Sequence, residues 1–469
     1  MSDFNLQASS RLPLADAALR LLHYATDDDL LLMVYNRHRG RSYTGEIAFP
    51  LFVHLLSDAL LGHRGSAHQT FKQAQEAGQL TASVQAMYGK LRRVPIPLSQ
   101  GLFAEAAARL AEVGVPAGDP VPTSLASFRP LGLDGKKLKY VVKRFKQLRG
   151  LKGNVFGGKL LVAQDICTGQ AVVVEATADG EAADNPLVPG AVAQVRALAD
   201  SRSRLWIADR AFCDFGTLNL LSQNDDHFVV RYHPKCGFHI DPTHRVRTGI
   251  DEQQRPFREE WGWLGKPNNP RRVRIRRIVV ERTTGDPLIL VSSLLDPQDH
   301  PATDLLIVYR RRWGIETMFQ QVVQTFDLRH LIGGSPQATV FQAVFCLLLY
   351  NTTLIVRDYV AVGAKRPSQT VSLHLLFDEL VRDLTAWMHV IGPDATAEVL
   401  AAELLSGPAA YRRYLKRILG TVWTDRWTKS KTVKRPPKKP PRAYLRGGHS
   451  SVYKILRGEH QEIPITPRK

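Results

Sequence analysis

The feature that most constrains the fold is a change of hydrophobic periodicity after residue 124. Two strand-like runs, Leu160 to Gln164 and Ala171 to Ala176, are joined by a turn containing Thr168 and Gly169, which predicts a β-hairpin. A helical segment, VPGAVAQVRALAD, then leads into a short apolar strand, RLWIAD, and a further helical segment, FGTLNLLSQ. Strands that alternate with helices predict a mixed α/β core.

The chain before this core has a different pattern. Apolar residues recur at helical spacing in FPLFVHLLSDALL and FAEAAARLAEV, so helices are expected from about 10 to 113. The segment GVPAGDPVPTS, residues 114–124, is rich in proline and glycine and is interpreted as a linker. We therefore expect a helical N-terminal domain and its linker at 1–124.

A β-rich segment interrupts the core. The runs HFVVRY, RRVRIRRIVVERT and LILVSSLL are typical of strands, which predicts an all-β insertion at 227–306 between two core parts, 125–226 and a helical 307–405. Arginines and apolar residues alternate from Arg272 to Val280, so one face of that strand is expected to be cationic while the other packs inward. A plain solvated edge is the alternative.

The most apolar stretch runs from Ala338 to Val356 and is long enough to span a bilayer. It contains Gln342, Asn351 and two threonines, which favours a buried core helix. The N-terminus lacks the basic start, apolar run and cleavage site of a secretory signal. The four cysteines are scattered without a CxxC pair, as expected in a reducing cytosol. We expect a cytoplasmic chain with no membrane partner.

The composition is strongly basic, with 63 Lys and Arg against 44 Asp and Glu and a formal charge of +19. A basic C-terminal region is expected at 406–469, and Asp425 to Lys469 alone hold 13 Lys and Arg against 3 Asp and Glu. The PPKKPP core of this tail cannot be helical, so it is expected to stay extended or disordered until it meets a polyanion. Nucleic acid is the favoured partner, ahead of an anionic membrane.

One polar cluster is loosely spaced like a zinc site. His233, Cys236, His239 and His244 lie within HPKCGFHIDPTH but match no standard structural zinc pattern. Ordinary polar loop residues are the favoured interpretation.

A second group of polar residues lies in VYRRRWGIETMF. Tyr309, Arg312 and Glu316 stand at i, i+3 and i+7, so in a helix they share one face. A surface ion pair explains such a face in most helices. Asp134, in LGLDGKKL, and Asp209, in LWIADRAF, are each typical of structural turn or strand-end aspartates when taken alone.

Together the three acids suit chemistry on phosphodiesters. Carboxylate oxygens hold Mg²⁺ or Mn²⁺, and two such ions about 4 Å apart stabilise the attacking and the leaving oxygens. Neighbouring arginines would then bind phosphates on either side of the scissile bond.

YRRRWGIETMF resembles the Tyr-x2-Arg-x3-Glu-x6-Lys signature of the cut-and-paste DDE transposases of bacterial insertion sequences, and LDGKK and ADRAF resemble the family's two aspartate motifs. The spacing agrees, with 75 residues from Asp134 to Asp209 and 107 from Asp209 to Glu316. The resemblance covers roughly 128–351. Val323 stands where the signature has a lysine. Asp165 is the alternative first acid, but it lies at a hairpin turn.

The resemblance implies a ribonuclease H-like core interrupted by the β insertion, behind an N-terminal domain that recognises element ends. It implies that the catalytic residues Asp134, Asp209 and Glu316 bind two Mg²⁺ or Mn²⁺ ions. The residues expected to contact DNA are Tyr309, Arg312, Arg210, Trp313, Trp261 and Trp263. Of these, either Trp261 or Trp263 could be the aromatic platform for a flipped base, and burial of these rings in the β core is the favoured alternative.

In the family, a water nicks the element end, and the freed 3′-hydroxyl attacks the opposite strand to form a hairpin. The hairpin reopens and the same hydroxyl attacks target DNA. The implied partner is double-stranded DNA, bound by a homodimer at the bacterial nucleoid. Two alternatives stay open: a ribonuclease H-like nuclease without strand transfer, and a catalytically inactive, transposase-derived DNA-binding protein, which Val323 motivates.

Overall fold

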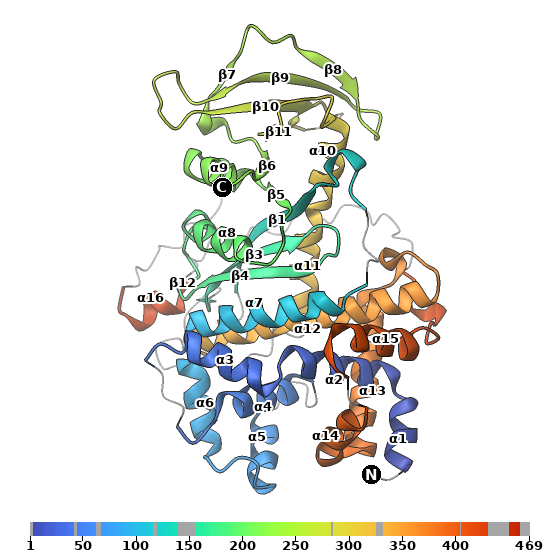
Figure 1. Ribbon diagram of the computed structural model, residues 1–469. Coiled ribbons are helices and arrows are strands. Elements are labelled where there is room, and N and C mark those ends of the chain that lie inside the picture. The colour runs from blue at the N-terminus through green and yellow to red at the C-terminus, as the bar shows by residue number, and fades with distance from the viewer. Residues whose placement is uncertain are drawn as a thin grey trace, which may run out of the picture.

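The structure is a computed structural model (Figure 1). It describes residues 3–41, 45–61, 67–115, 120–138, 155–282, 285–324, 332–403, 405–429 and 450–459. The PPKKPP core of the tail and residues 116–119 of the expected linker lie outside the described residues.

A ten-stranded mixed sheet runs through the middle and upper part of the molecule in the view of Figure 1. Its order is β4-β3-β1-β5-β6-β11-β10-β9-β7, and β8 pairs with β9; a separate two-stranded sheet joins β12 to β2. The strands are β1 Phe128–Lys137, β2 Val155–Phe156, β3 Lys159–Asp165, β4 Ala171–Thr177, β5 Ser203–Ala208, β6 His227–Arg231, β7 Phe238–Ile240, β8 Arg247–Ile250, β9 Pro256–Leu264, β10 Val273–Val280, β11 Leu288–Ser292 and β12 Ser450–Ser451.

The first five strands of the large sheet form the expected α/β core. β3 is antiparallel to β1 and β4, which confirms the predicted hairpin, whereas β5 is parallel to both β1 and β6. Helices α8 (Val188–Arg196) and α9 (Phe215–Leu221) make the crossovers between β4, β5 and β6. Both helices pack on the same face of the sheet, and a common apolar core joins them to β1 and β5.

The segment from β6 to β11 is β-rich, as the sequence predicts. Because β6 pairs in parallel with β5 and β11 pairs with β6, these strands continue the central sheet. They extend it upward in Figure 1 as a long antiparallel ribbon of β7 to β10.

The cationic face expected along β10 does not reach Arg276, although Arg272 and Arg274 stay at least partly exposed. The Arg276 side chain is fully buried and ion-paired with Glu259, and Arg277 is paired with Glu260. Apolar cores cover both faces of this strand, with Ile275 in one and Ile278 in the other. An arginine enclosed in this way needs a carboxylate partner, and β9 supplies it.

The lower half of Figure 1 is helical. The helices before the sheet are α1 Asp3–Ser10, α2 Pro13–Ala25, α3 Asp28–His38, α4 Phe49–Leu61, α5 Ala67–Glu76, α6 Val84–Arg93 and α7 Ile96–Val113. Those after it are α10 Ala302–Arg311, α11 Trp313–Gln324, α12 Pro336–Gly363, α13 Leu373–Val390, α14 Gly392–Ala402, α15 Gly407–Leu419 and α16 Val452–Leu456.

Helices from both ends of the chain share one apolar core built around α12. Helix α12 packs against α7, α2 and α6 on the N-terminal side and against α13 and α15 on the C-terminal side. Hydrogen bonds also join the N-terminal and C-terminal helices: the Arg20 guanidinium donates to the Leu400 carbonyl at 2.9 Å, and the Tyr414 hydroxyl donates to Asp16.

Helix α12 contains the long apolar stretch of the sequence. It is the one helix in the described ranges that is long and apolar enough to cross a membrane, and its apolar window is completely buried in the fold. Its polar residues tie it to other parts of the core. The Asn351 amide bonds both backbone groups of Ala171 on β4, at 3.0 and 2.7 Å, and Gln342 accepts from the Ile332 amide at 2.8 Å. The expected core helix is confirmed.

Part of the basic C-terminal region packs beside the α/β core through the separate two-stranded sheet. Strand β12 pairs in parallel with β2, and the Gly180 amide donates to the Ser451 hydroxyl at 3.2 Å. Lys454, on α16, donates to Glu181 at 2.7 Å. Residues 450–459 therefore contact the protein, and the prediction of an extended PPKKPP core falls outside the described residues.

Candidate active site at the ends of two parallel strands

The two candidate aspartates lie side by side. Leu133 on β1 pairs with Ala208 on β5, and Asp134 and Asp209 are the next residues of these parallel strands. Neighbouring strands are about 4.8 Å apart, so the two residues occupy adjacent backbone positions. The carboxyl ends of parallel strands are where α/β sheets commonly bind their ligands.

Asp209 stands at the end of β5 because the chain turns there into a short 3₁₀ segment, Arg210–Phe212. Its Oδ1 atom is buried and has no hydrogen-bond partner in the described structure. Arg231 on β6 brings its Nη1 atom to 3.9 Å from this oxygen, which is too far for a hydrogen bond. Asp209 therefore has a buried acceptor available for another group.

Glu316 reaches the site from helix α11, which packs against β1. Arg312 links α10 to α11 with helical angles, φ −49° and ψ −32°, so Tyr309, Arg312 and Glu316 keep the shared side that their spacing predicts. The Arg312 Nη2 atom is 3.0 Å from Glu316 Oε1, and its guanidinium lies 5.8 Å from the Tyr309 ring centroid.

Arg312 connects the three acids electrostatically. Burial works to lower the pKa of its guanidinium, but the charges of Tyr309, Asp209 and Glu316 raise that pKa overall. The positive charge also acts on Asp134. Because the Arg312 side chain is 9% exposed, this charge lies inside the acid cluster and offsets its repulsion.

Asp134 has an unusual affinity for protons. Burial raises the pKa of its carboxyl from 3.8 to about 6, against the opposing effects of Arg312 and of the Gly135 amide, which donates to Asp134 Oδ1 at 2.9 Å. The negative charges of Glu316 and Asp184 add to the increase. The energetic cost of ionising Asp134 is what a bound cation would remove.

A fourth acid, Asp184, was not singled out from the sequence. Its carboxylate lies directly over Gly135, where a Cβ atom would collide with it. The buried Lys159 ammonium is 2.8 Å from Asp184 and donates to the Ala182 carbonyl at 2.6 Å. The glycine directly after Asp134 was the available signal, since glycine marks places where another group approaches the backbone closely.

The other expected DNA contacts differ in accessibility. Trp313, at the start of α11, is 63% exposed, and Arg210 is exposed just beyond Asp209. Tyr309 is buried. Trp261 is also buried and donates to the Leu295 carbonyl at 2.8 Å, so as it stands it is unavailable to a flipped base. The Trp263 ring is covered by the Arg272 guanidinium at 4.3 Å.

The position of the signature lysine is partly buried in this chain, because Val323 packs against the helical core. A different lysine lies nearby: the Lys136 ammonium, on β1, is 5.5 Å from the Phe319 ring centroid on α11. Phe319 is one helical turn beyond Glu316, so the Lys136 ammonium lies near the Glu316 side of the site.

In the described residues no group of three or more His, Cys, Asp or Glu side chains lies close enough to hold a metal ion. The donor chemistry of Asp134, Asp209 and Glu316 nevertheless fits a hard cation, since all are carboxylates and Asp209 has a buried oxygen that accepts no hydrogen bond. In this structure the positive charge that balances Glu316 comes from Arg312. A metal would require this side chain to withdraw and the carboxylates to turn inward.

Comparisons with known proteins point to one class. Residues 137–352 match the family described as Transposase DDE domain, a range that contains Asp209 and Glu316 and begins three residues after Asp134. A protein of Sinorhizobium fredii (strain NBRC 101917 / NGR234) named "Putative transposase y4zB" is 22% identical over 156 residues, which are 33% of this chain and 43% of that protein. The alignment therefore spans less than half of that curated relative.

Among solved structures, the chain is similar to a piggyBac transposase in a synaptic complex with hairpin DNA. The identity is 12% and the TM-score 0.38, over 89% of this chain and 78% of that one, which is too distant a likeness for comparing residues. The family match and the curated relative support a DDE transposase.

Proposed function

We propose that this chain is a transposase that binds the ends of its own insertion sequence and cleaves and transfers DNA at a site formed by Asp134, Asp209 and Glu316. The observation that carries the proposal is that one buried arginine, Arg312, pairs with Glu316 at 3.0 Å and acts electrostatically on both aspartates. An acid cluster held around an arginine is suited to exchanging that cation for divalent metals and DNA phosphate.

The sheet supports a ribonuclease H-like core for this enzyme. Three antiparallel strands, β4, β3 and β1, are followed by the parallel strands β5 and β6, with helices in the crossovers. Asp134 lies on β1, Asp209 directly follows the adjacent strand β5, and Glu316 comes from helix α11, which packs against β1.

The three carboxylates would hold Mg²⁺ or Mn²⁺, which supply Lewis-acid stabilisation of the attacking and leaving oxygens of the phosphodiester. Arg312 would leave Glu316 and bind a phosphate next to the scissile bond, because a guanidinium pairs as well with phosphate as with carboxylate. Arg210, exposed just beyond Asp209, would bind a neighbouring phosphate.

A hairpin intermediate requires a base to leave the stack, and an exposed aromatic ring stabilises such a base. Trp313 is 63% exposed and directly follows Arg312, so it is better placed for this role than the buried Trp261. Lys136 would replace the missing signature lysine, since it lies against Phe319 on the helix of Glu316.

The direct test uses linear DNA bearing the inverted repeats that flank the gene, incubated with the chain and Mg²⁺. Excision is expected from the wild type and should be lost in Asp134→Ala, Asp209→Ala and Glu316→Ala. Asp165→Asn is the matched control, because Asp165 accepts from the Cys167 amide in the hairpin turn and should keep activity. Wild-type excision by all three acid variants would refute the assignment.

Val323 favours one alternative, a DNA-binding protein that has lost catalysis. That protein would bind the element ends with a steep salt dependence but show no Mg²⁺-dependent cleavage. A nuclease without strand transfer would cut yet leave no joined products on a gel. The resemblance also implies a homodimer on paired ends in the bacterial cytoplasm, which the mass of the DNA complex would test.

A further inference from the structure

The C-terminal segment 450–459 has a fixed place in the fold. It contains the short strand β12 and the helix α16, which lie at the left of Figure 1, level with β3 and β4. Ser451 and Val452 are completely buried. Because buried side chains are closely packed on every side, this segment is part of the structure around it.

The segment grips the loop that joins β4 to α8. The Lys454 ammonium is 2.7 Å from Glu181 and 3.7 Å from Asp179. The Ser451 amide donates to Glu181 at 2.7 Å, and the Gly180 amide donates to the Ser451 hydroxyl at 3.2 Å. One carboxylate oxygen of Glu181 thus binds the Ser451 amide and the other binds Lys454. Hydrogen bonds to a charged group are the stronger kind, so these contacts restrain the loop.

The far end of the same loop reaches the acid site. The Lys159 ammonium is 2.8 Å from Asp184 and donates to the Ala182 carbonyl at 2.6 Å. The Asp184 carboxylate fills the space beside Gly135 that a Cβ atom would need. The Gly135 amide donates to Asp134 Oδ1 at 2.9 Å. The loop therefore lies against the peptide that orients one of the candidate catalytic carboxylates.

A second set of contacts runs from the segment through β2. Strand β12 pairs in parallel with β2, which leads into Gly157 and Gly158. The Gly157 amide donates to the Leu138 carbonyl at 2.8 Å, and the Leu138 amide donates to the Gly158 carbonyl at 3.0 Å. Leu138 directly follows β1, the strand of Asp134. The segment therefore supports both the end of this strand and the loop that lies over it.

We propose that Lys454 is a positioning residue for the transposition reaction. Through Glu181 it holds the loop that keeps Asp184 against Gly135. This contact fixes the amide that orients the Asp134 carboxylate. The inference rests on the proposed function, which gives Asp134 its role in metal binding. Carboxylates that bind metals are themselves held by hydrogen bonds, and loss of such support weakens metal binding or activity.

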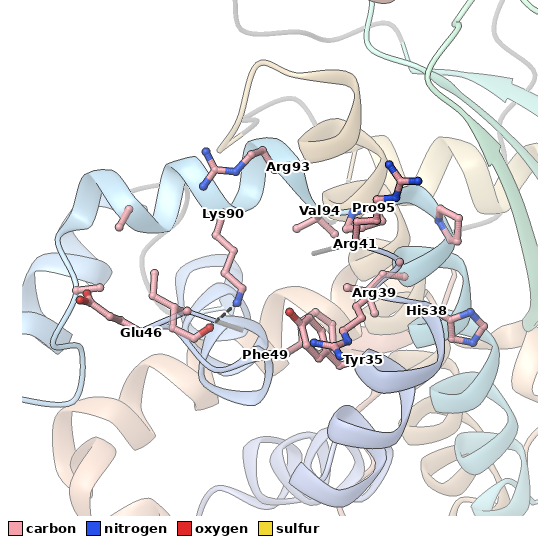
Figure 2. A pocket seen from close by; sticks show the side chains of 17 residues that line it. Tyr35, His38, Arg39, Arg41, Glu46, Phe49, Lys90, Arg93, Val94 and Pro95 are labelled. Carbon is pink, nitrogen blue, oxygen red and sulfur yellow. Dashed lines mark hydrogen bonds between the residues drawn. The ribbon is translucent and has the colours of Figure 1, made fainter. Parts of the chain in front are cut away.

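Hydrogen exchange of the full chain tests this link without catalysis. Lys454→Ala should speed amide exchange about threefold in residues 178–187 and also in 133–138, as expected for the loss of a partly exposed ion pair. Arg457→Ala is the matched control, because it removes the same charge directly after α16, where Arg457 pairs with Glu459. Peptides around the cavity in Figure 2 are the internal reference, since none of its lining residues takes part in these contacts.

The Mg²⁺ requirement of excision is the second readout. Lys454→Ala should raise the Mg²⁺ concentration for half-maximal excision about threefold, whereas Arg457→Ala and the conservative Lys454→Arg should leave it unchanged. Lys454→Glu should raise it further, because the new charge repels Glu181 and Asp179. Adding Glu181→Lys should recover part of that loss, since the ion pair is then reversed. A contact that only stabilised the fold would not change the Mg²⁺ requirement below the melting temperature.

Two results would overturn the proposal. One is faster exchange in 178–187 of Lys454→Ala with unchanged exchange in 133–138, because the loop would then be held without any effect on Asp134. The other is a Mg²⁺ requirement that is the same in Lys454→Ala as in the wild type or in Arg457→Ala. Excision that needs the three acids but not Lys454 would leave the proposed function standing. If the wild type excises nothing, the proposed function fails, and exchange in 133–138 still decides whether Lys454 positions Asp134.

Discussion

Replacing Asp134 with asparagine should stabilise the chain at neutral pH while removing its activity. The folded state raises the pKa of Asp134 from 3.8 to about 6, so the folded chain binds this proton more tightly than the unfolded chain does. The stability that the proton provides is present below about pH 4 and is lost as the pH rises to about 6. Asparagine has no charge to bury and avoids this loss.

The pKa difference sets the size of the effect. It is about two pH units at about 1.4 kcal/mol each, so the gain at pH 7.5 is at most about 3 kcal/mol. Thermal unfolding of the wild type and of Asp134→Asn should give similar midpoints near pH 4 and a higher midpoint for the variant at pH 7.5. Mg²⁺ should narrow the gap at pH 7.5 by stabilising the wild type alone.

Asp165→Asn is the control, because it removes a carboxylate paired with Arg129 at 3.3 Å and should bring no gain at pH 7.5. A difference between wild type and Asp134→Asn that is the same at both pH values would refute the reasoning. A less stable variant at pH 7.5 would refute it as well, since the buried charge would then not be costly.

Three further predictions concern residues of the site. Arg312→Met should lower the melting temperature without metal, because the acids lose the cation that offsets their repulsion. For the same reason, Mg²⁺ should stabilise this variant more than the wild type. An unchanged melting temperature and an unchanged response to Mg²⁺ would argue against this role of Arg312. Trp313→Ala should reduce hairpin formation on a DNA end while changing stability by less than ~0.5 kcal/mol, since the ring is exposed, and Trp313→Phe should restore hairpins. Gly135→Ala should cost on the order of 1–3 kcal/mol through its collision with Asp184, and Asp184→Gly should recover part of that loss in the double variant.

The helices and strands could be predicted from the sequence, but which of them pack against each other could not. Periodicity predicts that α2 and α13 each bury one face, and it does not say that they bury these faces against each other across the whole chain. The same limit explains Arg276. Its alternation with apolar residues indicates a strand with two faces, and only the pairing of β10 with β9 brings Glu259 to the buried arginine.

The acid site was predictable where its residues lie in ordered local motifs. The strand-end position of Asp209 and the helical spacing of Arg312 and Glu316 are visible in the sequence. Asp184 and Lys136 were not identified from the sequence. Asp184 lies in a loop and Lys136 is the first of two consecutive lysines, and nothing in the neighbouring sequence distinguishes either residue from an ordinary surface charge.

The most direct test of the central claim is an X-ray measurement at the manganese edge on crystals of the chain grown with Mn²⁺. We expect anomalous peaks between the carboxylates of Asp134, Asp209 and Glu316, with the Arg312 guanidinium withdrawn from Glu316. Manganese bound elsewhere, with Arg312 still paired to Glu316 and no peak between the three acids, would contradict the account.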